Sequence, residues 1–149
     1  MPSGTGMQPS PRLSVQSDLA PRSDEFTQIR DGLMAFNTSQ AGPATVDRFA
    51  VYLRDAPGTI HGGLVGFFAW KWMSVDWLWV AEPVRGQGYG SELLRTAEAL
   101  AREAGCVGAK LDTYEFQARP FYERHGYSVF GVLEGYPANT RTYYMEKAL

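Results

Sequence analysis

The segment Val84-Arg85-Gly86-Gln87-Gly88-Tyr89-Gly90-Ser91 lies between two segments of different hydrophobic periodicity, and together the three indicate the fold. Before it, residues 75–81 form a short apolar run rich in aromatic and β-branched side chains, which is typical of a buried strand. After it, apolar residues from Leu93 to Ala104 recur at helical spacing, and Gly105 stands where such a helix would end. We therefore predict a strand, a glycine-rich turn and an amphipathic helix in direct succession.

The composition of this turn predicts a binding site for phosphate groups. Gly86, Gly88 and Gly90 permit backbone conformations closed to other residues and let several N–H groups approach one anion. The helix that follows places the positive end of its dipole beside them. Arg85 adds a charge that can bind a phosphate through two hydrogen bonds, and Ser91 adds a hydroxyl. We therefore expect the turn to bind a pyrophosphate.

Spacing separates the nucleotide-binding motifs that contain such turns. The dinucleotide motif G-x-G-x-x-G fails, because Ser91 or Leu93 stands where its third glycine belongs. The nucleoside-triphosphate loop fails too, because no Gly-Lys-Ser/Thr follows a first glycine at the required distance. The pattern R-x-x-G-x-G is met by Arg85, Gly88 and Gly90. This pattern resembles the coenzyme A pyrophosphate loop of the GNAT N-acetyltransferase superfamily.

The C-terminal part of the chain extends this resemblance. Residues 107–114 have the composition of a strand, and residues 117–125 that of a short helix with the string Phe121-Tyr122-Glu123. Gly126-Tyr127 then ends the helix and begins another strand, in the same order and at the same spacing as in the superfamily. The resemblance is specific from Val75 to the end of the chain.

The N-terminal half predicts a helix followed by a meander of strands. Residues 24–36 carry apolar side chains at near-helical spacing. Residues 49–54 and 60–70 have the composition of two strands, and Asp55-Ala56-Pro57-Gly58 suits the turn between them. A third strand follows from Val75. The predicted fold is α/β, with a GNAT-like mixed, mostly antiparallel central sheet and flanking helices.

Composition bounds the domain organisation and the class of partner. The chain has 149 residues, of which 44% are hydrophobic, enough for one compact domain. Residues 1–24 are rich in proline, serine and glycine, so we predict a flexible tail there and a single domain over 25–149, with residues 13–15 as a candidate edge strand. The net charge of −2 argues against nucleic-acid and anionic-membrane partners. No segment has the pattern of a signal peptide or transmembrane helix, which predicts a cytoplasmic protein.

The single cysteine and the two histidines predict no further chemistry. Cys106, His61 and His125 lack the spacing of metal ligands, so we expect no metal. Cys106 at the start of a strand has no base nearby in sequence, so a buried structural cysteine is preferred to an acyl-enzyme nucleophile.

The resemblance implies transfer of an acetyl group from acetyl-CoA directly to a primary amine within a ternary complex. The strand around Leu78 and Val80 is implied to offer backbone groups to the oxyanion and to the pantetheine amides. Tyr122 occupies the general-acid position, from which a phenol can give a proton to the leaving thiolate; the alternative is a core aromatic residue beside Phe121. The cofactor-binding residues implied in this way are Leu78, Val80, Arg85, Gly86, Gln87, Gly88, Tyr89, Gly90 and Ser91.

Two carboxylates are candidates for the base that accepts the proton of the substrate ammonium group. Asp76 interrupts an apolar strand just before the oxyanion segment, although a solvated aspartate is the alternative. Glu115 ends the following strand, where the family often has an asparagine that binds the cofactor. Glu82 and His125 are better explained as a loop residue and a helix-end residue.

The acceptor is a small-molecule or peptide amine that the sequence does not specify further. Trp70, Trp72, Trp77 and Trp79 alternate along adjacent strands, where they are either core or interface residues or line the acceptor cleft and stack on a cation. A homodimer through these aromatic strands is a further hypothesis. The alternatives to an enzyme are a noncatalytic acyl-CoA-binding regulatory module and an aromatic-rich interaction domain without a cofactor.

Overall fold

The computed structural model describes residues 12–149, and contacts divide the chain into two units at Gly42 and Pro43. The first unit contains α1 (Ser23–Ala41), and residues 12–22 form neither helix nor strand. The edge strand expected at residues 13–15 is therefore absent from the described residues. Residues 1–11 of the predicted tail lie outside the described residues, and the domain boundaries stay a prediction.

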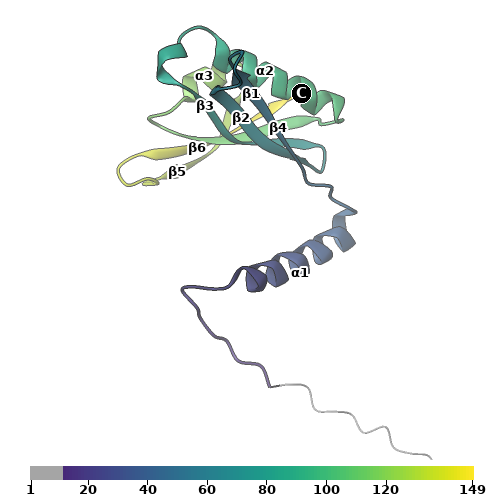
Figure 1. Cartoon of the computed structure of the whole chain (residues 1–149). Helices are drawn as coiled ribbons and strands as arrows, with labels where there is room; N and C mark the ends of the chain where they lie inside the picture. Colours follow the sequence, from purple (N-terminus) through teal and green to yellow (C-terminus); the bar gives the residue numbers. More distant parts are fainter. Residues whose placement is uncertain (1–11) are drawn as a thin grey trace, which may run out of the picture. The chain divides into compact units, whose positions relative to one another are not determined.

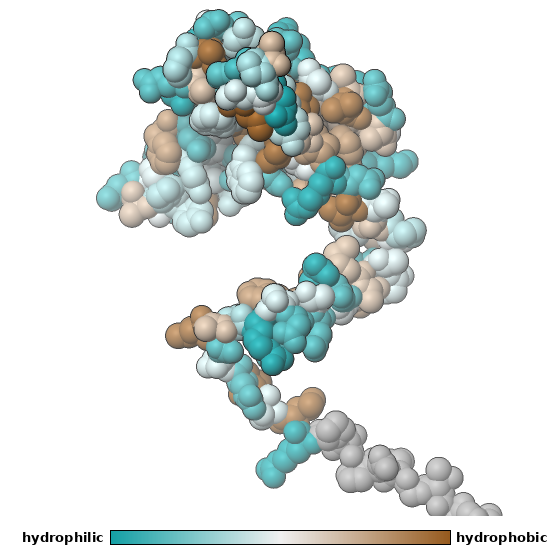
Figure 2. All heavy atoms as spheres, viewed as in Figure 1, coloured by the Kyte–Doolittle hydropathy of each residue, from teal (hydrophilic) through white to brown (hydrophobic). Residues whose placement is uncertain are grey.

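Helix α1 is longer than the predicted helix at residues 24–36. It continues through the polar residues Asn37 to Gln40 and ends at Gly42, which has a φ of 78° and donates its N–H to the carbonyl of Thr38 (3.0 Å). Its surface carries both hydrophobic and hydrophilic residues (Figure 2). The exposed apolar side chains are those of Phe26, Ile29, Leu33 and Phe36.

The second unit is a six-stranded sheet with helices, as the sequence predicts (Figure 1). Its strands are β1 (Asp47–Arg54), β2 (Ile60–Ala69), β3 (Trp72–Val80), β4 (Gly108–Tyr114), β5 (Ser128–Glu134) and β6 (Arg141–Ala148). Its helices are the short 3-10 helix η1 (Glu82–Val84), α2 (Tyr89–Glu103) and α3 (Arg119–Arg124). The strand order is β1-β2-β3-β4-β6-β5, and every neighbouring pair is antiparallel except β3 and β4. The mixed, mostly antiparallel sheet is thereby confirmed.

The core lies between the sheet and the helices α2 and α3, which cover the same side of it (Figure 1). The apolar stripe of α2 supplies Leu94 and Ala97, both fully buried, as its helical spacing predicts. Met73 from β3 and Met145 from β6 meet them from the sheet. Among residues 12–149, no helix is both long and apolar enough to cross a membrane.

Strand β3 begins three residues earlier than predicted and carries an irregularity in its middle. Trp70 and Lys71, at φ of 45° and 62°, form the tight turn from β2, so the predicted strand at residues 60–70 ends one residue early. Val75 pairs with Gly66 and Trp77 with Val65, which leaves Asp76 as the extra residue of a bulge.

The parallel pairing of β3 and β4 is short, and this opens the sheet. It consists of the pairs Trp72 with Gly108, Met73 with Ala109, and Ser74 with Lys110. The two strands are unpaired beyond these positions, so the second half of β3 has a free edge toward β4. The bulge at Asp76 lies at the point where the two strands separate. A bulge bends the strand that carries it, which explains why the pairing ends here.

Candidate active site

A cavity of about 810 Å³ occupies the gap between β3 and β4. Its walls come from β3, the glycine-rich turn, the start of α2, the middle of β4 and the segment around α3. Because strands that no longer pair leave their backbone groups free, the cavity is lined on one side by backbone as well as by side chains. The residues from β3 and the turn are Val75, Asp76, Trp77, Leu78, Trp79, Val80, Val84, Arg85, Gly86, Gly88, Tyr89, Gly90 and Ser91.

The glycine-rich turn has the predicted backbone conformation at Gly86 and Gly88, whereas Gly90 lies in the first turn of α2 without a positive φ. Gly86 and Gly88 have φ of 74° and 88°, in the left-handed region that side chains disfavour. An added Cβ at either position would meet nothing within 4 Å, so the backbone angle rather than lack of space requires glycine. Gly88 is also the N-cap of α2, whose first residues Tyr89, Gly90 and Ser91 line the cavity. The N-terminal end of α2 is therefore available to an anion there.

Arg85 joins the turn to the end of β3. Its Nε donates to the carbonyl of Val80 over 2.8 Å, while its terminal nitrogens donate to no group among the described residues. The Nε of the exposed guanidinium is thus held in place, and its two terminal nitrogens are available to bind a phosphate. Leu78 and Val80 line the cavity with Arg85, whereas Gln87 does not.

Tyr122 contributes a buried phenol to the same cavity. It lies on α3 with 6% of its surface exposed and packs edge-on against Phe121 and Tyr127, at ring distances of 5.1 and 5.7 Å. Burial, and secondarily the negative charge of Asp112, raises the pKa of Tyr122 to about 12. The ring therefore packs in the core while the residue lines the cavity, and the phenol is protonated at neutral pH.

Two carboxylates line the cavity with Tyr122. Asp76 sits on the bulge of β3 and forms an ion pair of 3.6 Å with the exposed Arg48 of β1. Asp112 comes from the middle of β4, and its carboxylate makes no ion pair or hydrogen bond with any residue from 12 to 149. Asp112 was not among the predicted site residues, since a polar residue that alternates with apolar ones along a strand is typical of the side that faces solvent.

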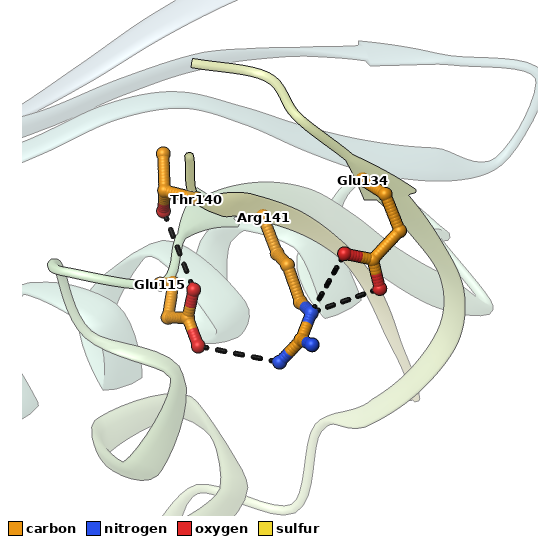
Figure 3. Close-up of polar contacts among 4 residues, drawn as sticks. All are labelled: Glu115, Glu134, Thr140 and Arg141. Carbon is orange, nitrogen blue, oxygen red and sulfur yellow. Dashed lines mark hydrogen bonds and ion pairs between the residues drawn. The ribbon is translucent and has the colours of Figure 1, made fainter. Parts of the chain in front are cut away.

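The structure does not bring Glu115 together with Tyr122 and Asp76. Glu115 borders a separate small pocket, where its carboxylate accepts from Arg141 Nη1 and from Thr140 Oγ1, both at 3.4 Å. Figure 3 shows Arg141 between Glu115 and Glu134, to which its Nε donates at 2.8 and 2.9 Å. The charge of Glu115 is thus engaged outside the cavity.

A contact between the turn and α3 was also missed. Ser91 Oγ lies 2.8 Å from His125 Nε2, although the residues are far apart in sequence. Burial lowers the pKa of His125, so the imidazole is neutral at pH 7. Among residues 12–149, no three His, Cys, Asp or Glu side chains are arranged to hold a metal ion.

The four tryptophans have three different surroundings. Trp70 lies in the exposed turn between β2 and β3, and the ring of Trp72 packs against the backbone of Gly108. Trp77 and Trp79 line the cavity and are largely exposed. Two of the four therefore lie at the cavity, and the other two do not.

The family follows from a comparison with known proteins. The model of the acetyltransferase (GNAT) family matches residues 17–127, which include the turn, Asp76 and Tyr122. The chain belongs to the GNAT acetyltransferase family. This family membership and the named acetyltransferase relatives make the protein an acyltransferase, rather than a noncatalytic acyl-CoA-binding module or an interaction domain.

Individual relatives of the GNAT family agree with this assignment. Blasticidin-S acetyltransferase of Streptomyces morookaense is 39% identical over 127 residues, which are 85% of this chain and 92% of that protein. An acetyltransferase of Agrobacterium fabrum is 37% identical over 133 residues, which are 89% of this chain and 96% of that protein. A crystal structure of an acetyltransferase from Bacillus cereus superposes with a TM-score of 0.82 at 32% identity, covering 90% of this chain and 98% of that one.

Proposed function

We propose that the protein transfers the acetyl group of acetyl-CoA to a primary amine by direct attack in a ternary complex. The observation that carries this proposal is one cavity that unites a phosphate-binding turn, the free edge of β3 and the phenol of Tyr122. The name of the Streptomyces relative adds support for a small-molecule amine as acceptor. The cytoplasmic location and the homodimer remain predictions.

The residues of the turn and of β3 fit coenzyme A. Gly86 and Gly88 leave open space beside a backbone that only glycine adopts readily, and the positive end of α2 and the Arg85 guanidinium face the same region. These groups would hold the pyrophosphate. The unpaired edge of β3 at Leu78 and Val80 offers backbone groups to the pantetheine amides and to the oxyanion.

Tyr122 and Asp76 would move the two protons of the reaction. As the amine nitrogen bonds to the acetyl carbon and the carbon–sulfur bond breaks, Tyr122 donates its phenolic proton to the leaving thiolate, and the second proton that the acetylated nitrogen then loses restores the phenol. Asp76 accepts the proton that the ammonium group must lose before attack. We assign the base to Asp76 rather than Glu115, because Asp76 lines the cavity and Glu115 binds Arg141 outside it.

Binding of acetyl-CoA tests the first half of this proposal. In calorimetric titrations we expect acetyl-CoA, but neither NADH nor ATP, to bind. Arg85→Glu should weaken the binding at least tenfold, because it places a negative charge beside the phosphates. Absence of acetyl-CoA binding to the native protein would remove the proposed function.

Release of thiol during turnover tests the second half. With an amine panel that includes blasticidin S, Tyr122→Phe should lower kcat by about 10²- to 10⁴-fold and leave the Kd for acetyl-CoA within twofold. Tyr127→Phe is the matched control, because its buried hydroxyl has no hydrogen-bond partner among residues 12–149 and the residue does not line the cavity. Equal kcat values for the two variants would contradict the role of Tyr122.

A further inference from the structure

We propose that the acceptor is a small amine that carries a flat aromatic ring and no negative charge. It would bind between Trp77 and Phe116, where the carboxylates of Asp76 and Asp112 attract a positive charge and repel a negative one. This inference rests on the proposed acetyl transfer and adds the chemical class of the second substrate.

The two substrates are expected on opposite sides of the sheet. Leu78 and Val80 of β3 pack against the core beneath α2 and α3. Successive residues of a strand face opposite sides, so Trp77 and Trp79 face away from the helices. The same alternation in β4 turns Asp112 away from the helices, because its neighbour Leu111 is buried in the core. The cavity therefore passes through the gap between β3 and β4, with the phosphate-binding turn on the helix side.

The side away from the helices carries an aromatic surface. Trp77 is 76% exposed and Phe116 67% exposed, although both line the cavity. Phe116 stacks on Tyr114 at a ring distance of 5.4 Å, and Tyr114 meets Tyr136 at 6.2 Å. Large aromatic rings that stay exposed at the mouth of a cavity offer flat faces to a ligand ring, and such faces also attract cations.

The charges of the cavity select against an anionic acceptor. Asp112 has no ionic or hydrogen-bonding partner among residues 12–149, and Asp76 is paired only with the exposed Arg48 at 3.6 Å. The arginines that line the cavity are Arg85, which follows β3 in the turn, and Arg124 on α3. The second substrate thus meets two carboxylates, which favour an ammonium group and repel a carboxylate.

Three amines of matched size isolate the two parts of this inference. They are 2-phenylethylamine, 2-cyclohexylethylamine, which lacks only the flat ring, and phenylalanine, which adds only a carboxylate. By thiol release under saturating acetyl-CoA, we expect kcat/KM for 2-phenylethylamine to exceed that of either control by about tenfold. Trp77→Leu should abolish the preference over the cyclohexyl compound, and Asp112→Asn should narrow the preference over phenylalanine. Trp70→Leu, in a turn away from the cavity, should leave both preferences unchanged.

The outcomes separate this inference from the proposed function. Equal kcat/KM for the three amines, or acetylation of aliphatic panel amines alone, would overturn the acceptor class and leave acetyl transfer standing. Failure to bind acetyl-CoA would overturn the proposed function instead. Acetyl-CoA binding without acetylation of any amine would count against both.

Discussion

Replacing Gly66 with alanine should destabilise the protein at the bulge from which the cavity opens. Gly66 pairs with Val75, next to the extra residue Asp76. A Cβ added there would overlap the carbonyl oxygen of Ser74 and approach a ring carbon of Phe49 to 3.2 Å. The overlapping atom belongs to the backbone of the neighbouring strand and cannot turn away, so β2 and β3 must move apart.

The expected magnitude follows from competing effects. Gly66 does not have a positive φ, so alanine itself fits the backbone angle and by restricting the unfolded chain would stabilise by about 0.4–1 kcal/mol. Overpacking typically costs about 1–3 kcal/mol, and a clash between backbones belongs at the upper end. We therefore expect a net loss of about 2 kcal/mol in the free energy of unfolding. Because Asp76 is the extra residue of the bulge and Trp77 follows it, kcat should fall as well.

Urea-induced unfolding, followed by tryptophan fluorescence, measures this effect. Gly131→Ala is the matched control, because it also lies at a bulge in a strand, yet its added Cβ would meet Tyr144 side-chain atoms only at an ordinary 3.7 Å. The control should be neutral or slightly more stable than the native protein. Stabilities of the two variants within about 0.5 kcal/mol of each other would refute the role assigned to the Gly66 contact.

Two further predictions concern ionisable groups that are partly or fully removed from solvent. Burial lowers the pKa of His125 in the folded protein, so the unfolded chain binds the proton more tightly. The free energy of unfolding should therefore be constant above about pH 6.5 and decrease as the pH falls toward the lowered pKa. In urea titrations at a series of pH values, His125→Gln should reduce this decrease. An unchanged slope in the variant would contradict it. Lys147→Met should cost about 2–3 kcal/mol, because it removes the nearer cation, at 2.8 Å, from the buried Glu98 and leaves only the half-exposed Arg102 at 3.5 Å. Adding Glu98→Leu should restore most of the loss in the same assay, and a further loss on adding it would contradict the prediction.

Elements with a strong local pattern were predicted well from the sequence. The α2 stripe, the positive φ of Gly86 and Gly88, and the hairpin of β1 and β2 each depend on residues close together in the chain. Element ends were less accurate. The start of β3 at Trp72 depends on a turn through Trp70 and Lys71, which adopt positive φ without being glycine, and no composition rule indicates this.

The candidate site was predictable only as far as the family motif reaches. Tyr122 and Asp76 line one cavity, but their assigned roles stay predictions. The partner of Glu115 is Arg141, brought near by the pairing of β4 with β6, so its engagement could not be seen in the local sequence. Asp112 was overlooked for a related reason, because only the early end of the β3–β4 pairing exposes it to the cavity.

Because β3 and β4 pair over a short stretch, the sheet consists of two three-stranded halves, β1-β2-β3 and β4-β6-β5, that are joined by three residue pairs. A molecule bound in the gap contacts both halves and so connects them, as an additional strand would, for as long as it is bound. If acetyl-CoA binds as proposed, a free concentration of one hundred times its Kd raises the free energy of unfolding by about 2.7 kcal/mol. The rates of proteolysis and of amide hydrogen exchange in β3 and β4 would then depend on the concentration of acetyl-CoA. The enzyme would be least stable when no acetyl-CoA is bound.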